Sequence, residues 1–188
     1  MTRFEYFSVL LSIIIGLGLA QLLSGIARLV RDGRSLAPAW WVMCVIATLV
    51  LAHLQIWWVC YGLRELPEWT FFSYAAFMIV PSLLYILTYL VLPVDLHLNG
   101  HELAQAFIAK RKVFFGILGL LVFSTFFQQW MLTGETPKAD LDAGLRVIWL
   151  LIAVPAFLSP RILVQAIAAL ASLIVMMLYI NLLFVQMR

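Results

Sequence analysis

Hydrophobic residues form six long blocks along the chain, separated by short polar segments. A helix that crosses the hydrocarbon core of a bilayer needs about 20 apolar residues, and five of the blocks reach that length easily. The pattern therefore predicts an all-α, six-span transmembrane bundle with a single integral membrane domain, residues 1–188. The blocks are Phe4 to Ala27, Ala39 to Leu63, Trp69 to Leu92, Val113 to Thr133, Leu141 to Ser159 and Ile162 to Met187.

The fifth block is shorter than the others. Its uncharged part, Val147 to Pro160, has 14 residues and contains Pro155. The long side chain of Arg146 can extend to the membrane surface, which lets Leu141–Ser159 cross the bilayer. We expect it to cross, and a short or re-entrant helix is the alternative.

Small residues recur at every fourth position of the first block. They are Ser8, Ser12, Gly16, Ala20 and Ser24. Residues four apart lie along one ridge of a helix, and small side chains on such a ridge let neighbouring helices approach closely in lipid. We expect this ridge to make the first helix the central one of the bundle.

The composition supports a membrane protein, since 65% of the residues are hydrophobic, 11% are charged and the mean hydropathy is +1.06. A soluble domain has about 25% charged residues. The net charge of +3 is too small and too dispersed to indicate nucleic-acid binding. Enzyme and metal motifs are absent, and a bis-histidine haem would need a second mid-membrane histidine, so no catalytic residue, metal or cofactor is predicted.

Basic residues are more numerous on one side of the predicted bundle. Seven of the 12 lie in the first, third and fifth loops, where they include two tight clusters. The positive-inside rule places these loops in the cytoplasm and both termini outside the plasma membrane. Such clusters anchor helices, and a site for anionic lipid headgroups is the alternative. The clusters are Arg28, Arg31 and Arg34, and Lys110, Arg111 and Lys112.

Several polar side chains are expected in the outer half of the membrane. His53 is the one titratable group far from either surface, and a partner could bring its pKa into the physiological range. The set predicts an ion or solute pathway, and the alternative is that these groups only join helices by hydrogen bonds. The set is Glu5, Ser12, His53, Gln55, Gln128 and Asn181.

The leading hypothesis for function is a small channel or transporter for an ion, a proton or a small solute. An accessory subunit of a larger membrane complex is the alternative, and an intramembrane cofactor- or lipid-binding enzyme is the weaker one. Membrane lipids are expected partners, together with further copies of the chain or other membrane subunits, because small spans with short loops usually need partners to form a pore.

Two local patterns add detail. Pro81 and Pro155 each remove a helical hydrogen bond, which frees the carbonyls of Phe77 and Leu151. Kinks of this kind serve packing, and hinge or cavity roles are the alternatives. The run Asn99–Glu102 has the residues of a helix start, with Asn99 as the cap and Glu102 reaching back. Asp95, His97 and His101 complete a set with metal-ligand chemistry near this start, but Asn99 and Gly100 interrupt the spacing, which favours a solvated loop.

Overall fold

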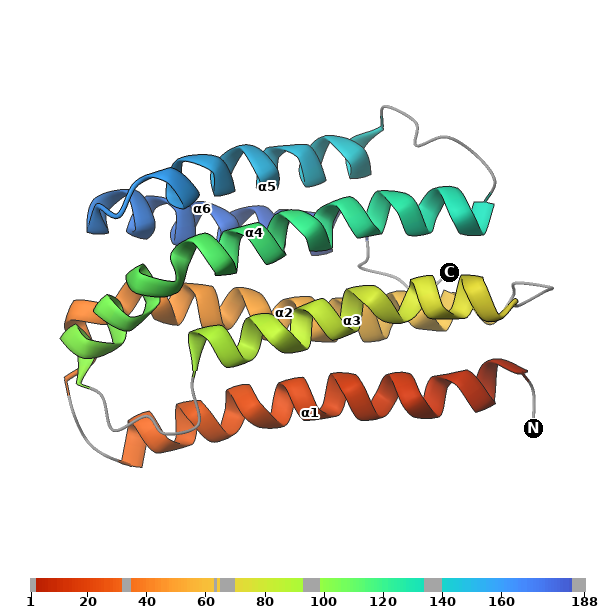
Figure 1. Cartoon of the computed structure of the whole chain (residues 1–188), viewed down its shortest axis with the longest axis horizontal. Coiled ribbons are helices and arrows are strands. Elements are labelled where there is room, and N and C mark those ends of the chain that lie inside the picture. Colours follow the sequence, from red (N-terminus) through yellow and green to blue (C-terminus); the bar gives the residue numbers. More distant parts are fainter. Residues whose placement is uncertain are drawn as a thin grey trace.

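The computed structural model describes residues 3–31, 35–62, 64, 70–92, 99–133 and 140–183, and the described elements are all helical. Six α-helices lie side by side in an elongated bundle (Figure 1). Their bounds are α1 Arg3–Arg31, α2 Trp40–Gly62, α3 Phe71–Val91, α4 Gly100–Thr133, α5 Leu141–Leu158 and α6 Ile162–Leu183, with a short 3₁₀ helix, η1 Ala37–Ala39, before α2.

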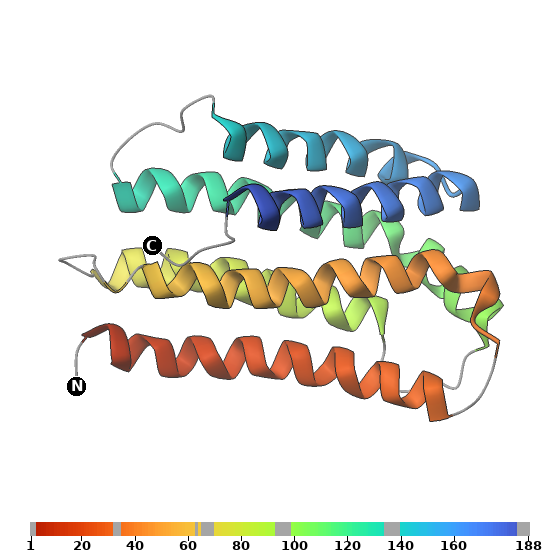
Figure 2. The ribbon, with the colours of Figure 1, turned by 180° about the vertical axis from the view of Figure 1, so that it is seen from behind.

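Successive helices run in opposite directions along the bundle. Helix α6 runs toward the end of the molecule at which α1 begins, in both the front and the back views (Figures 1 and 2). Five helices, α1, α2, α3, α5 and α6, are long and apolar enough to cross a membrane. The six-span prediction is therefore confirmed for five helices.

The remaining helix, α4, is the longest, and its C-terminal part, Val113–Thr133, carries no charged residue. Helix α5 is uninterrupted over 18 residues although Pro155 lies inside it, as a full crossing requires. Many large apolar side chains on the outer surface are exposed, for example Phe71, Leu151 and Leu163. Exposed apolar surface on this scale is typical of a protein surrounded by lipid.

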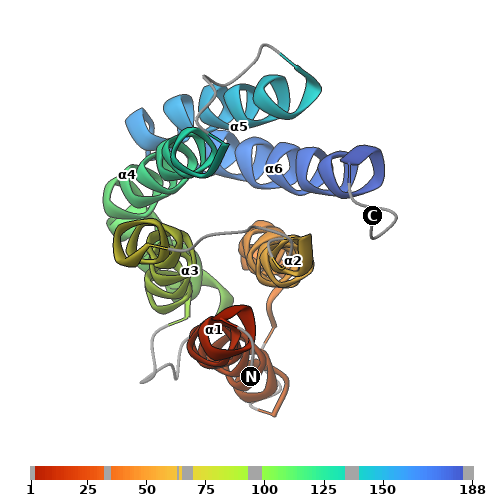
Figure 3. The same cartoon turned by 90° about the vertical axis from the view of Figure 1, so that its right-hand side faces the viewer.

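Five of the helices form a closed ring. Each of α2 to α6 contacts the next helix along the chain, and α6 also contacts α2. Helix α1 lies outside this ring and packs against α2 and α3, as the view along the bundle shows (Figure 3). The prediction that α1 is the central helix is therefore wrong.

The small-residue ridge of α1 faces the bundle only in part, because Ser8 and Ser12 are half-buried and the rest of the ridge is not. Gly16, Ala20 and Ser24 are exposed, and open space surrounds the position where a Gly16 side chain would begin. The buried face of α1 is a different one, made by Leu11, Ile15, Gly18, Leu22, Gly25 and Leu29. Its alternating spacing of four and three averages ~3.6 residues, so it stays on one side of a straight helix. A ridge with a strict four-residue spacing, in contrast, rotates around the helix axis by about 160° over 16 residues.

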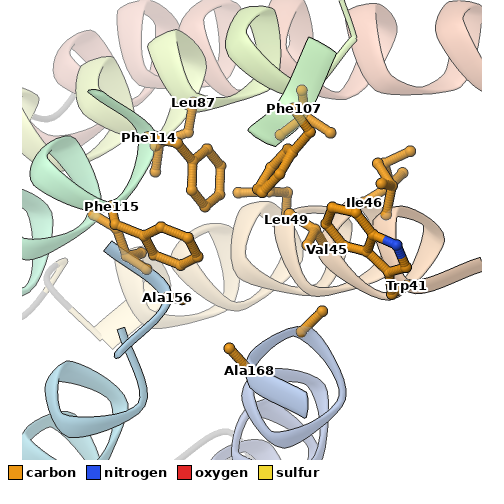
Figure 4. Close-up of a cluster of buried hydrophobic side chains, with 14 of the residues drawn as sticks. Trp41, Val45, Ile46, Leu49, Leu87, Phe107, Phe114, Phe115, Ala156 and Ala168 are labelled. Atoms are coloured by element: carbon orange, nitrogen blue, oxygen red, sulfur yellow. The ribbon is translucent and has the colours of Figure 1, made fainter. Parts of the chain in front are cut away.

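The core contains an aromatic cluster near the end of the bundle where α2 begins (Figure 4). The rings of Trp41 and Phe107 are 5.3 Å apart, and Phe107 in turn lies 5.0 Å from Phe114. The start of α4 agrees with the sequence prediction, because Glu102 Oε2 accepts from the Asn99 N–H and Asn99 Oδ1 accepts from the Glu102 N–H. Asp95 and His97 lie outside the described residues.

Candidate functional site

His53 lies in the contact between α1 and α2 and is buried, with 1% of its surface exposed. Its Nδ1–H donates to the Leu49 carbonyl at 2.7 Å, so that in a neutral ring Nε2 is the unprotonated nitrogen. Nε2 points at Gly18 so closely that a Cβ added there would be 2.1 Å away. Nε2 has no hydrogen-bond partner in the described part of the chain. His53 therefore occupies the space that the missing Gly18 side chain leaves.

The other residues of the predicted pathway do not gather around His53. Glu5 is exposed in the first turn of α1, and the Ser12 hydroxyl donates to the Ser8 carbonyl of its own helix. Asn181 is exposed and donates to the Met177 carbonyl, also of its own helix. Two of these polar groups, on Ser12 and Asn181, thus bond within their own helices rather than to His53, and the pathway stays a prediction.

Gln128 joins α4 to α3 about one turn before Pro81. Its Nε2 donates to the carbonyls of Ala76 and Phe77 on α3, at 2.9 Å each. The Phe77 carbonyl is the one that Pro81 deprives of its helical donor. Gln128 thus replaces the missing hydrogen bond from α4, as expected for an amide that joins helices.

Residues of α2 to α6 line a partly open cavity of about 100 Å³, which we call the lumen. Side chains from all five ring helices line it, among them Leu49, Leu84, Leu118, Trp149 and Ala169. On α6 the lining extends from Gln165 to Tyr179, about 21 Å along the axis at ~1.5 Å per residue. Gln55 lines the lumen, but His53 does not.

A charged cluster that sequence analysis missed lies beside one end of the lumen. Arg146 on α5 binds both carboxylate oxygens of Asp142, and its Nη1 donates to Gln129 Oε1 at 3.3 Å. The Tyr179 hydroxyl donates to Asp142 Oδ1 at 2.7 Å. Arg146 and Tyr179 also line the lumen. The i,i+4 spacing of Asp142 and Arg146 is a signal from which the ion pair could have been predicted.

Two polar atoms of lumen-lining residues are buried without a hydrogen-bond partner among the described residues. They are Nε1 of Trp149 and Oε1 of Gln165. Gln165 is only 1% exposed, and its Nε2 donates to the carbonyls of Ala156 and Ser159, at 2.7 Å each. Residues of the lumen wall, which is otherwise largely apolar, thus carry one buried donor and one buried acceptor without a partner among the described residues.

The basic clusters lie at the end of the bundle where α1 ends and α4 begins. Arg31, Lys110 and Lys112 are exposed, whereas Arg28 and Arg111 are half-buried. Arg111 Nη1 donates to the Ile108 carbonyl at 3.1 Å. Arg34 falls outside the described residues. A headgroup site at these residues stays a prediction.

Within the described residues, no three His, Cys, Asp or Glu side chains are grouped as metal ligands would be. Comparison with known proteins gives no match: no family model, no curated protein and no solved structure is significantly similar to the chain. The geometry of the lumen and its surroundings is therefore the basis for inferring function.

Proposed function

We propose that the protein is a six-span integral membrane protein that binds a small apolar molecule, or the end of an apolar chain, in the lumen. The observation that carries the proposal is the lumen itself, a cavity lined by all five helices of the ring. Ligand sites in helical bundles commonly lie between the helices and combine an apolar wall with a few placed polar groups. The lumen has this composition.

The size of the lumen limits its ligand. A cavity of about 150 Å³ lined by Leu, Ile and Phe stays dry and takes up benzene or xenon. At about 100 Å³ the lumen is somewhat smaller, so it suits a molecule of a few carbon atoms or one branch of a longer chain. Because an apolar cavity of this size holds little water, it favours apolar binding over the ion pathway first considered, whose titratable residue, His53, lies outside it.

Xenon is the direct probe of the proposed function. In the purified protein in nanodiscs, xenon should shift the methyl resonances of lumen residues such as Leu49 and Leu84 until the shifts saturate. The resonance of Ile167, which is exposed, should shift without saturation. The substitution Ala169→Leu fills the lumen and should abolish saturation. Ala171→Leu, on the same helix but outside the lining, should preserve it. Linear shifts for all methyl groups would refute the proposal.

A second candidate function is that of an accessory subunit, in which α1 packs against another membrane helix. Two observations favour it: α1 lies at the edge of the bundle, and its Gly16–Ala20–Ser24 edge is exposed. A Ser24→Cys variant, with Cys44 and Cys60 replaced by Ser, should form a crosslinked pair of copies if the partner is a second chain. A different membrane subunit should instead co-purify with the protein, and absence of both a crosslink and a co-purified subunit would refute the accessory role.

The membrane setting completes the proposal. We place α4 as the sixth span, the loops after α1, α3 and α5 in the cytoplasm and both termini outside the plasma membrane, in accordance with the basic clusters. Anionic lipid headgroups are the proposed partners of Arg28, Arg31 and Arg34, and of Lys110, Arg111 and Lys112.

A further inference from the structure

Gln165 has a fixed amide orientation. Both hydrogens of its Nε2 are used, one on the Ala156 carbonyl and one on the Ser159 carbonyl. Turning the amide over would place Oε1 against these two carbonyl oxygens, neither of which can donate a hydrogen bond. Oε1 is therefore the atom that remains, and it is a hydrogen-bond acceptor.

This acceptor is unpaired in an apolar setting. Gln165 lines the lumen and is almost completely buried, and Oε1 has no partner in the described part of the chain. A buried acceptor without a donor costs free energy, which a bound donor would recover.

Helix α6 itself offers a water molecule at Oε1 few further partners. Buried water usually makes two to four hydrogen bonds to polar groups. The next polar side chain that α6 contributes to the lumen is Ser172, seven residues on, about 10 Å along the helix.

We infer that the lumen's ligand is an alcohol, an apolar molecule with one hydroxyl group that donates a hydrogen bond to Gln165 Oε1. The inference rests on the proposed function and narrows it to a chemical class. The hydroxyl donates to Oε1, while the hydrocarbon part extends along the lumen past Ala168 and Ala169, one turn further along the same face of α6.

Two isomeric probes separate hydrogen bonding from size. Trifluorobutanol and trifluoropropyl methyl ether have the same atoms, but only the alcohol can donate a hydrogen bond. Fluorine NMR titration of the wild-type protein in nanodiscs measures the saturable binding of each. We expect the alcohol to bind at least about fivefold more tightly, as one hydrogen bond provides, although the ether leaves water more readily. Equal affinities, or a preference for the ether, would overturn the inference.

Substitution at the acceptor gives the second arm. Gln165→Met retains the length of the side chain and removes Oε1, so the alcohol should lose its advantage while the ether binds as before. Binding of the ether to this variant shows that the lumen is intact. If the alcohol kept its advantage in Gln165→Met, Oε1 would not be its partner. Xenon uptake without a preference for the alcohol would refute this inference alone, whereas absence of xenon uptake would refute the proposed function.

Discussion

At the scale of single residues, the contact between Gly18 and His53 holds α1 against the ring. Glycine is required at position 18 because the imidazole of His53 occupies the space where a Cβ would lie. In lipid, where no hydrophobic effect drives helices together, close approach of this kind provides much of the packing energy. A second contact repeats it seven residues on, where Gly25 makes room for Leu92.

Substitution of Gly18 by Ala should therefore destabilise the bundle by about 1–3 kcal/mol, the usual cost of overpacking a core. The matched control is Gly16→Ala, which adds the same methyl group in open space on the same helix and should change stability little. Unfolding of the purified variants in mixed micelles measures both. Combining Gly18→Ala with His53→Ala should recover part of the loss, and equal stability of the two glycine variants would contradict the packing described.

Gln128 gives a second prediction at this scale. Gln128→Leu leaves the Phe77 carbonyl without the donor that replaces the bond lost to Pro81, so it should cost about 1–3 kcal/mol. In a Pro81→Ala background the helix supplies its own donor to Phe77, and the same substitution should cost less. A double-mutant cycle on unfolding free energies measures the difference. An identical cost in both backgrounds would show that the Gln128 amide does not compensate for the hydrogen bond lost at Pro81.

At the scale of elements, the sequence predicted which segments are helices better than it predicted which faces meet. The helices follow directly from block length and hydrophobicity, and the cap at Asn99 follows from local chemistry. The faces that meet are harder to predict, because a span that is apolar all round shows no contrast between its lipid side and its core side. Helix α1 has small residues on two faces. Gly18 and Gly25 belong to the buried face, which alone follows the helical period. The lumen was equally hidden, because it depends on how five helices meet.

The charged cluster around Arg146 connects α5 to α4 and α6 by hydrogen bonds. Asp142 and Arg146 are 21% and 17% exposed, so each remains partly hydrated. Arg146→Met leaves Asp142 with only the Tyr179 hydroxyl, and we expect a loss of about 1–3 kcal/mol, below the ~3–5 kcal/mol of a fully buried pair. Tyr179→Phe, which removes one hydrogen bond, should cost about 1 kcal/mol. Thermal unfolding in detergent compares them.

The control for this cluster is the variant that replaces both charges, Asp142→Asn with Arg146→Gln. It leaves no unpaired charge, so it should be more stable than the Arg146→Met protein. If the double variant were the least stable of the three, the ion pair itself, rather than the cost of an unpaired carboxylate, would be what holds α5 against α4 and α6.

At the scale of the whole molecule, the ring of α2 to α6 and the peripheral helix α1 have different proposed roles. Helices α2 to α6 line the lumen and carry the polar groups that a ligand would meet, whereas none of the described side chains of α1 is part of its lining. Changes on the exposed edge of α1 should therefore alter assembly without altering the lumen, and changes in the lumen should alter binding without altering assembly. This separation lets the two candidate functions be tested independently.

The arrangement in the membrane is the last prediction, and it tests α4 as the sixth span. Asn99 and Asp140 flank α4, so a crossing places them on opposite sides of the bilayer. Single cysteines at these positions, in a protein with Cys44 and Cys60 replaced by Ser, can be labelled in intact cells with a membrane-impermeant maleimide. We expect labelling at position 140 and not at 99, because the basic clusters favour the cytoplasmic side for the start of α4. Permeabilised cells provide the control, in which both positions should react. Labelling of both positions in intact cells would mean that α4 does not cross, and the reverse pattern would invert the bundle while leaving all six spans in place.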